Sequence, residues 1–185
     1  MESSIEADLA HFRSIPWCAE HLNRPDQVVR SFSARRDKRS TQYLFTKVLN
    51  TPNALPHMLT MYDQPADGDV VKEVRALITL GLDVGGFEGV CHGGMVMSLL
   101  DEVAGELGAL NQKVGVIDYK MVMTAYLNTK FHRPLLIPAT VFAKTWVTKV
   151  EGRKFYVAVV IEDKDGNTLA SADALFMGVK DKGRL

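Results

Sequence analysis

The sequence GVCHGGMVMSLLDE, from Gly89 to Glu102, says more about the architecture of this chain than any other segment. A histidine and two glycines open a run whose apolar residues recur with the spacing of an α-helix. Six apolar side chains gather on one arc of the helical wheel, and they are Met95, Val96, Leu99, Leu100, Val103 and Leu107. The pattern predicts a helix that packs one face against a core.

The opposite side of this helix carries one carboxylate among small side chains. The residues on that side are Gly94, Met97, Ser98, Asp101, Gly105 and Gly108. A glycine inside a helix costs about 1 kcal/mol relative to alanine, so the pattern suggests that a ligand or another backbone needs the space. The alternative is that Asp101 is a surface carboxylate at the margin of an amphipathic helix.

The start of the helix has the features of a site for negative charge. Gly93 and Gly94 leave amide N–H groups without partners inside the helix, at the positive end of its dipole. Such N–H groups suit a developing oxyanion. In the alternative interpretation His92 is an ordinary capping residue and the glycines form a turn.

Composition limits the classes of function. With 185 residues, 46% of them hydrophobic, the chain is long enough for one domain with a sizeable core. Its 22 basic and 22 acidic residues give no overall field for nucleic acid or an anionic membrane, so we expect neither as a partner. Cys18 and Cys91 make neither a disulfide framework nor a metal-binding pattern, which predicts a reducing compartment and no metal.

The N-terminal sequence lacks targeting signals. It is acidic and has neither the pattern of a signal peptide nor that of a transit peptide. No apolar run approaches the roughly 20 residues that span a bilayer. We therefore expect a soluble, cytoplasmic protein.

The densest basic cluster is expected to be solvated, with phosphate contacts as the alternative. It comprises Arg30, Arg35, Arg36, Lys38 and Arg39.

The region before the motif is the least regular. Residues 1–41 are expected to form a helical or irregular extension, with helical character from 8 to 21 and no periodicity from 23 to 41. The main domain is expected to span 42–185. Residues 43–49 and 55–62 look like two extended segments joined by a turn at 51–53, and residues 70–82 look like a strand.

The region after the helix is clearer. Residues 121–131, 140–150, 154–162 and 168–179 are rich in β-branched and apolar residues, and Asp165-Gly166 joins the last two runs as a hairpin. The last three runs predict an antiparallel meander. The fold class is therefore α+β, with a sheet that packs on one long helix.

Three collinear segments of the chain are informative together: His92-Gly93-Gly94 followed by Asp101, the strand from Met123 that runs into Phe131-His132-Arg133-Pro134, and residues 152–167. Through these segments, residues 70–180 resemble the hotdog fold, and specifically the PaaI-like acyl-CoA thioesterases. The resemblance implies an antiparallel sheet wrapped around a long central helix, with an extra N-terminal segment.

The same resemblance implies roles for individual residues. Asp101 would act as general base toward water or as nucleophile on the thioester carbonyl, and the Gly93 N–H would polarise the thioester oxygen. His92 would position the acyl group or the helix start. Thr124 would orient water or the carboxylate, and Gly94 would keep the approach open.

Further residues are candidates for substrate binding. Gly94 and Ser98 lie on the face that would meet substrate, and Arg133 and Lys154 would meet the phosphates of CoA. The alternative for Arg133 and Lys154 is a solvated charge, and for Ser98 a small packing residue. One position departs from the family, because many relatives carry Asn or Gln six residues before the motif histidine, where this chain has Gly86.

The resemblance predicts hydrolysis of an acyl thioester of CoA or of an acyl carrier protein, without a cofactor. It also predicts a homo-oligomer, a dimer or a dimer of dimers, in which the Asp of one protomer meets the His-Gly-Gly region of the other. Because of Gly86, an acyl-thioester binding protein without turnover stays open, as does a dehydratase or cyclase acting on a polyketide-type intermediate.

Other potentially reactive residues are expected to have structural roles. Cys91 beside His92 lacks a third group to orient a Cys–His pair, and Ser98 lacks the elbow sequence of serine hydrolases. Four histidines without metal-ligand spacing are expected to be structural or at the surface: His11, His21, His57 and His132. Phe142, Trp146 and Phe155 are expected to line an acyl tunnel or to fill the interface between sheet and helix.

Overall fold

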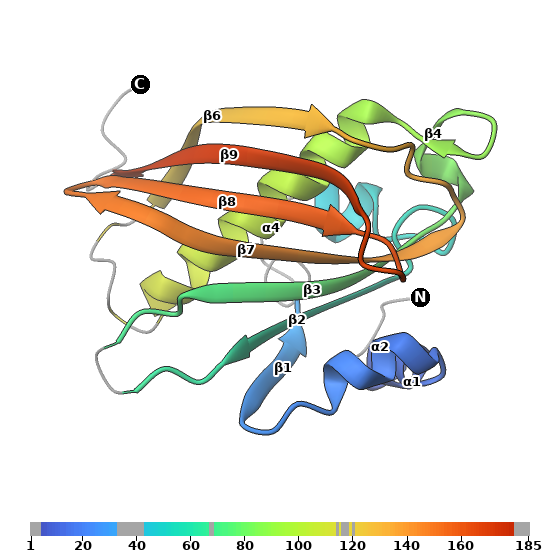
Figure 1. Cartoon of the computed structure of the whole chain (residues 1–185), viewed down its shortest axis with the longest axis horizontal. Coiled ribbons are helices and arrows are strands. Elements are labelled where there is room, and N and C mark those ends of the chain that lie inside the picture. Colours follow the sequence, from blue (N-terminus) through green and yellow to red (C-terminus); the bar gives the residue numbers. More distant parts are fainter. Residues whose placement is uncertain are drawn as a thin grey trace.

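A computed structural model describes residues 5–32, 43–66, 69–113, 115, 119 and 121–179. Its centre is α4 (Gly93–Lys113), a helix of 21 residues that packs against one face of a seven-stranded antiparallel sheet (Figure 1). The strand order is β1-β2-β3-β7-β8-β9-β6. The strands are β1 (Gln27–Ser31), β2 (His57–Asp63), β3 (Glu73–Leu80), β6 (Met121–Phe131), β7 (Ala139–Glu151), β8 (Lys154–Glu162) and β9 (Thr168–Val179).

The predicted apolar face of α4 forms the core. Five of its six residues are buried and Met95 is partly buried, and the five are Val96, Leu99, Leu100, Val103 and Leu107. Side chains alternate across each strand, so Ala76 and Ile78 of β3 face this core while Leu77 faces the other side of the sheet. A large antiparallel sheet packed on one long central helix agrees with the hotdog fold and confirms the predicted fold class.

The outer face of the sheet is covered in part by the N-terminal helices. Helices α1 (Ile5–Arg13) and α2 (Pro16–Leu22) are separated where Pro16 occupies the first turn of α2. They pack against β1 and β2, on the side opposite α4 (Figure 1). Phe12 and Cys18 are fully buried there against Leu59, Met61 and Leu77.

Two local predictions were wrong. Residues 43–49 are not extended, because Leu44–Val48 form a π-helical turn (η1) closed by the Leu49 N–H, which donates to the Leu44 carbonyl. Residues 23–41 were expected to lack periodic structure, yet they contain β1, which pairs with β2. A strand of five residues at a sheet edge gives too short a pattern to detect.

The prediction for the basic cluster was also wrong at Arg30, the one residue of the cluster that the structure describes. Arg30 was expected to be solvated, but it is buried because it points from β1 into the core. Arg35, Arg36, Lys38 and Arg39 lie outside the described residues. The proposed division of the chain at residue 41 stays a prediction.

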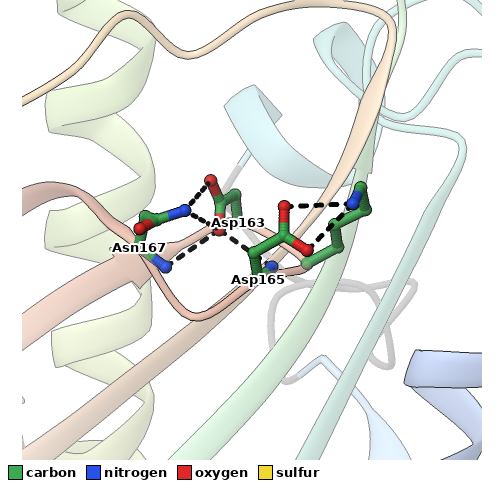
Figure 2. A network of polar contacts seen from close by, with 4 residues as sticks. Asp163, Asp165 and Asn167 are labelled. Carbon is green, nitrogen blue, oxygen red and sulfur yellow. Dashed lines mark hydrogen bonds and ion pairs between the residues drawn. The ribbon is translucent and has the colours of Figure 1, made fainter.

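The predicted hairpin at Asp165-Gly166 is confirmed. The Asp163 carboxylate accepts hydrogen bonds from the backbone N–H groups of Asp165 and Asn167, both at 2.9 Å, and from the Asn167 side chain (Figure 2). Gly166 has a φ of 78°, a conformation that favours glycine. The turn fixes the register of β8 and β9 and thereby the inner face on which α4 packs.

Candidate active site

The start of α4 is held by a short loop. The small strands β4 (Gly85–Phe87) and β5 (Val90–Cys91) follow a 3-10 turn, η2 (Leu82–Val84), and lead into His92. The His92 N–H donates to the Val84 carbonyl over 2.8 Å, and His92 Nδ1 accepts a hydrogen bond of 3.0 Å from the Gly94 N–H. His92 therefore caps the helix, which fits its expected part in positioning the helix start.

The N–H of Gly93 has no hydrogen-bond partner in the described part of the chain. It lies at the first position of a long helix, where the dipole favours negative charge. Gly93 also lines a cavity of about 350 Å³. The predicted oxyanion donor is thus free and placed beside a cavity.

That cavity is largely apolar and has two polar residues at its wall. Val90, Val96 and Leu135 line it together with His132 and Arg133. His132 Nε2 is 2.8 Å from the Ser171 hydroxyl, and Arg133 Nη1 donates to the Thr168 carbonyl over 3.0 Å. Both side chains are exposed, so Arg133 remains accessible to a charged group.

Asp101 meets Thr124 from the edge strand. The Thr124 hydroxyl donates a hydrogen bond of 2.8 Å to Asp101 Oδ1. Directly after Thr124 the pairing of β6 with β9 shifts, with Ala125 as the extra residue of a bulge. A bulge redirects the side chains beside it. Of the two expected roles of Thr124, the geometry shows contact with the carboxylate.

A second cavity, of about 330 Å³, lies at this pair. Asp101, Gly105 and Thr124 line it, and so do two further carboxyl groups, Glu102 and Glu106. Burial, with the charges of Glu106 and Asp101 added to it, raises the pKa of Glu102 to about 7. Sequence reasoning assigned no role to Glu102 or Glu106, although two carboxylates at i and i+4 on a core helix are an unusual pattern.

One chain does not bring all predicted residues together. Gly93 and Asp101 are eight residues apart on α4, which corresponds to about 12 Å along the axis. They line different cavities. A carbonyl oxygen at the Gly93 N–H is therefore out of reach of the Asp101 carboxylate of the same chain.

The remaining substrate-binding candidates are separated as well. The Ser98 hydroxyl donates to the Gly94 carbonyl over 2.9 Å, which is a bond within the helix and not a bond to a histidine. Lys154 is exposed and pairs with Met177, whereas Arg133 bonds Leu169 at the far end of β9. Eight residues of strand, about 26 Å, separate these two points.

Gly86 lies directly against His92. A Cβ at position 86 would meet the Cα and Cδ2 atoms of His92, each at 3.0 Å. An Asn or Gln at this position would therefore require His92 to move. The packing of this loop therefore suits glycine at position 86 better than the amide side chain that the family resemblance would place there.

The other reactive side chains have structural surroundings. Burial raises the pKa of the Cys91 thiol to about 11, so it is protonated at neutral pH and is a poor nucleophile. His57 Nδ1 is 2.8 Å from the buried Asp8 carboxylate, and the His11 ring stacks on His57. His21 stacks on Phe142, which lies on the outer face of the sheet and is therefore excluded from the interface with α4.

The described residues offer neither a metal site nor a membrane-spanning helix. The described residues contain no group of three His, Cys, Asp or Glu side chains placed to hold a metal ion. No helix in the described ranges is long and apolar enough to cross a membrane.

Comparison with known proteins links the middle of this chain to thioesterases. Residues 88–170, which contain the His92 loop, α4 and the strands after it, match the thioesterase superfamily. The middle of this chain is therefore similar to the thioesterase superfamily. The comparisons support a thioester hydrolase, and Asp101, Gly93 and Thr124 all lie inside the matched region.

Two curated relatives differ in how much of each protein is shared. The verlamelin biosynthesis protein B of Lecanicillium sp. is 28% identical, and the match covers 91% of this chain and 87% of that protein. The acyl-coenzyme A thioesterase THEM4 of Rattus norvegicus is 33% identical over 57% of this chain. The match covers 43% of the rat protein, so this chain spans less than half of its length.

Solved structures share the fold. A phenylacetic acid degradation-related protein of Ralstonia eutropha has a TM-score of 0.51 at 21% identity, covering 60% of this chain and 76% of that one. A hypothetical thioesterase of Streptococcus pneumoniae, solved with coenzyme A, has a TM-score of 0.53 at 13% identity, covering 67% and 88%. At these identities the likeness shows the fold alone.

Proposed function

We propose that this protein hydrolyses acyl thioesters of coenzyme A or of an acyl carrier protein, as a PaaI-like hotdog thioesterase. The observation that carries the proposal is the Asp101 carboxylate, held by the Thr124 hydroxyl at 2.8 Å in the wall of a cavity. The acyl-coenzyme A thioesterase named among the relatives supports CoA as the thiol carrier. Two unpaired cysteines, Cys18 and Cys91, support the proposed cytoplasmic location.

The proposed chemistry has two parts. The Gly93 N–H would donate to the thioester oxygen and stabilise the negative charge that develops on it. Asp101 would either take a proton from the attacking water or attack the carbonyl carbon itself. Thr124 would keep one carboxylate oxygen hydrogen-bonded and leave the other free for water or the carbonyl. His92 and Gly94 would shape the helix start around the oxyanion.

Substrate binding would use the cavity at the helix start. Its apolar wall suits an acyl chain or the pantetheine arm, and the exposed Arg133 would meet a phosphate of CoA. Ser98 and Lys154 are weaker candidates, because Ser98 already bonds the Gly94 carbonyl and Lys154 lies far from this cavity in one chain.

We further propose that the working unit is a homodimer, or a dimer of dimers, with sites shared between copies. Within one chain Asp101 is about 12 Å along α4 from the Gly93 N–H, so a second copy must complete the site. The edge strand β6 is 11 residues long and exposes Met121, Met123 and Tyr126. An exposed apolar edge of that length favours burial against another strand.

The test is thiol release from a panel of acyl-CoA and carrier-bound acyl thioesters. The wild type should release thiol, and Asp101→Asn, which preserves shape and removes charge, should lower kcat by about 10²-fold or more. Met97→Leu is a matched control on the same face of α4. Hydrolysis that is equally fast in Asp101→Asn would refute the assigned role.

The absent amide at Gly86 favours one alternative, a protein that binds acyl thioesters without turnover. In that case calorimetry would show binding of acyl-CoA while no thiol appears. The mass of the product identifies the other non-hydrolytic class, because a dehydratase removes water from the acyl group and leaves the thioester intact.

A further inference from the structure

Arg30 places a permanent charge inside the apolar core. It lies on β1 with 7% of its surface exposed, and its neighbours on the same face, Val28 and Phe32, pack into the main core. An arginine cannot lose its proton in a protein, so burial cannot neutralise this group. A buried charge of this kind destabilises the fold unless another group compensates it.

The described part of the chain does not supply that compensation. Neither Nη1 nor Nη2 of Arg30 has a hydrogen-bond partner, and both atoms are buried. The Tyr62 ring is 5.9 Å from the guanidinium carbon, near the limit of a cation–π contact. The other buried arginine, Arg75, forms an ion pair with Asp63. Two other nitrogens of Arg75, Nε and Nη1, also lack hydrogen-bond partners, so the difference between the two arginines is the carboxylate beside Arg75.

A second unpartnered polar group lies beside Arg30. Thr60 of β2 is the direct cross-strand partner of Arg30, which places both side chains on the same face, with Cβ atoms about 5 Å apart. Thr60 is fully buried, and its hydroxyl has no hydrogen-bond partner among the described residues. Two hydrogen-bond donors of adjacent strands thus lie on the same buried face without a partner among the described residues.

We propose that Arg30 and Thr60 bind a small oxyanion, a carboxylate or a phosphate group. The planar guanidinium offers two parallel N–H donors that match two oxygens of such a group, and the hydroxyl adds a third donor. Strand β1 is an edge of the sheet, so no further described strand covers this side. The site is separate from the Asp101 cavity, to which neither β1 nor β2 contributes.

The experiment measures binding rather than hydrolysis, so its outcome is independent of the proposed function. Wild-type protein is titrated with sodium acetate and, separately, with sodium phosphate, at neutral pH and at an ionic strength kept constant with sodium chloride. Calorimetry gives Kd, and thermal unfolding gives Tm. At least one anion should bind and raise Tm. Acetate identifies a carboxylate ligand and phosphate a phosphoryl ligand.

Three variants assign the binding to these residues. Arg30→Met should weaken Kd by about tenfold or more, and Thr60→Val, which preserves shape, by a smaller factor. Arg13→Met removes an exposed arginine of α1 and should leave Kd unchanged. If Arg30→Met does not fold, Thr60→Val decides. Equal Kd values in wild type and variants, or no binding of either anion, would overturn the proposal and leave an internal water or an uncompensated charge only.

Discussion

The hydrogen bond from Thr124 to Asp101 makes a prediction about catalysis. Thr124→Val keeps the shape of the side chain and removes the donor, and a hydrogen bond to a charged group contributes about 1.5–3 kcal/mol. We expect kcat for thioester hydrolysis to fall about 10-fold to 100-fold. Thr124→Ser keeps the hydroxyl and should retain most of the activity. A loss of the same size in the serine variant would mean that packing, not the hydrogen bond, is what matters.

Glu102 predicts a pH dependence of stability. Its pKa is raised from the model-compound value of 4.5 to about 7, first by burial and then by Glu106 and Asp101. Between these two values the folded chain keeps a proton that the unfolded chain releases, so a rise in pH destabilises the fold. Glu102→Gln removes this effect. The free energy of unfolding of the Glu102→Gln variant, minus that of the wild type, should increase between pH 4.5 and 7 by at most about 1.4 kcal/mol per pH unit. Above pH 7 this difference should stay constant.

Urea unfolding of both proteins at several pH values checks the prediction. Because other titrating groups, such as the histidines, are common to both proteins, their contributions cancel in the difference. A difference that does not change with pH would show that Glu102 titrates at the same pH in the folded and the unfolded chain.

For single residues, the sequence identified reactive side chains but not the contacts and burial around them. Asp101 and Thr124 were identified from the motif and the family resemblance, and their contact depends on a bulge after Thr124 that no local pattern predicts. The raised pKa of Glu102 was missed, because it arises from burial in the folded chain and from neighbours on the helix. Arg30 was expected at the surface, because the polar residues around it gave no recognisable strand pattern.

At the scale of elements, long periodic segments were predictable and short ones were not. The limits predicted for β6, β8 and β9 agree with the structure, since each alternates over at least nine residues. Strand β1 has five residues, and η1 has an apolar pattern that suits a helix turn as well as a strand. In both short elements, contacts with the rest of the fold outweigh local preference.

The N-terminal helices predict a separation of stability from activity. Phe12 of α1 is fully buried on the outer face of the sheet, opposite α4. Phe12→Ala should lower the free energy of unfolding by about 3–5 kcal/mol. Below the unfolding temperature it should leave kcat and KM unchanged, because α1 contacts neither cavity of the candidate site.

Chemical denaturation and steady-state kinetics on the same preparation test this separation. Leu99→Ala in α4 is the matched comparison, since it lowers stability by a similar amount on the side of the sheet that carries Asp101. A change in kcat caused by Phe12→Ala in fully folded protein would show that α1 takes part in the site.

At the scale of the whole molecule, the separation of Asp101 and Gly93 predicts complementation between two inactive chains. Gly93→Pro removes the N–H at the first position of α4, where proline is well tolerated, and should lower kcat by about 10²–10³-fold. Gly93→Ala is its control, because a Cβ there meets Phe131 at an ordinary 3.6 Å and the N–H is kept. Asp101→Asn supplies the second inactive chain.

When the two inactive chains are mixed at equal amounts, unfolded and refolded together, half of the dimers pair one chain of each kind. If sites are shared between copies, each mixed dimer has one intact site, formed by Asp101 of one chain and Gly93 of the other. The mixture should then recover about one quarter of wild-type activity. A mixture as inactive as its parents, although mixed dimers are detected by mass, would place the complete site within one chain and contradict the geometry of α4.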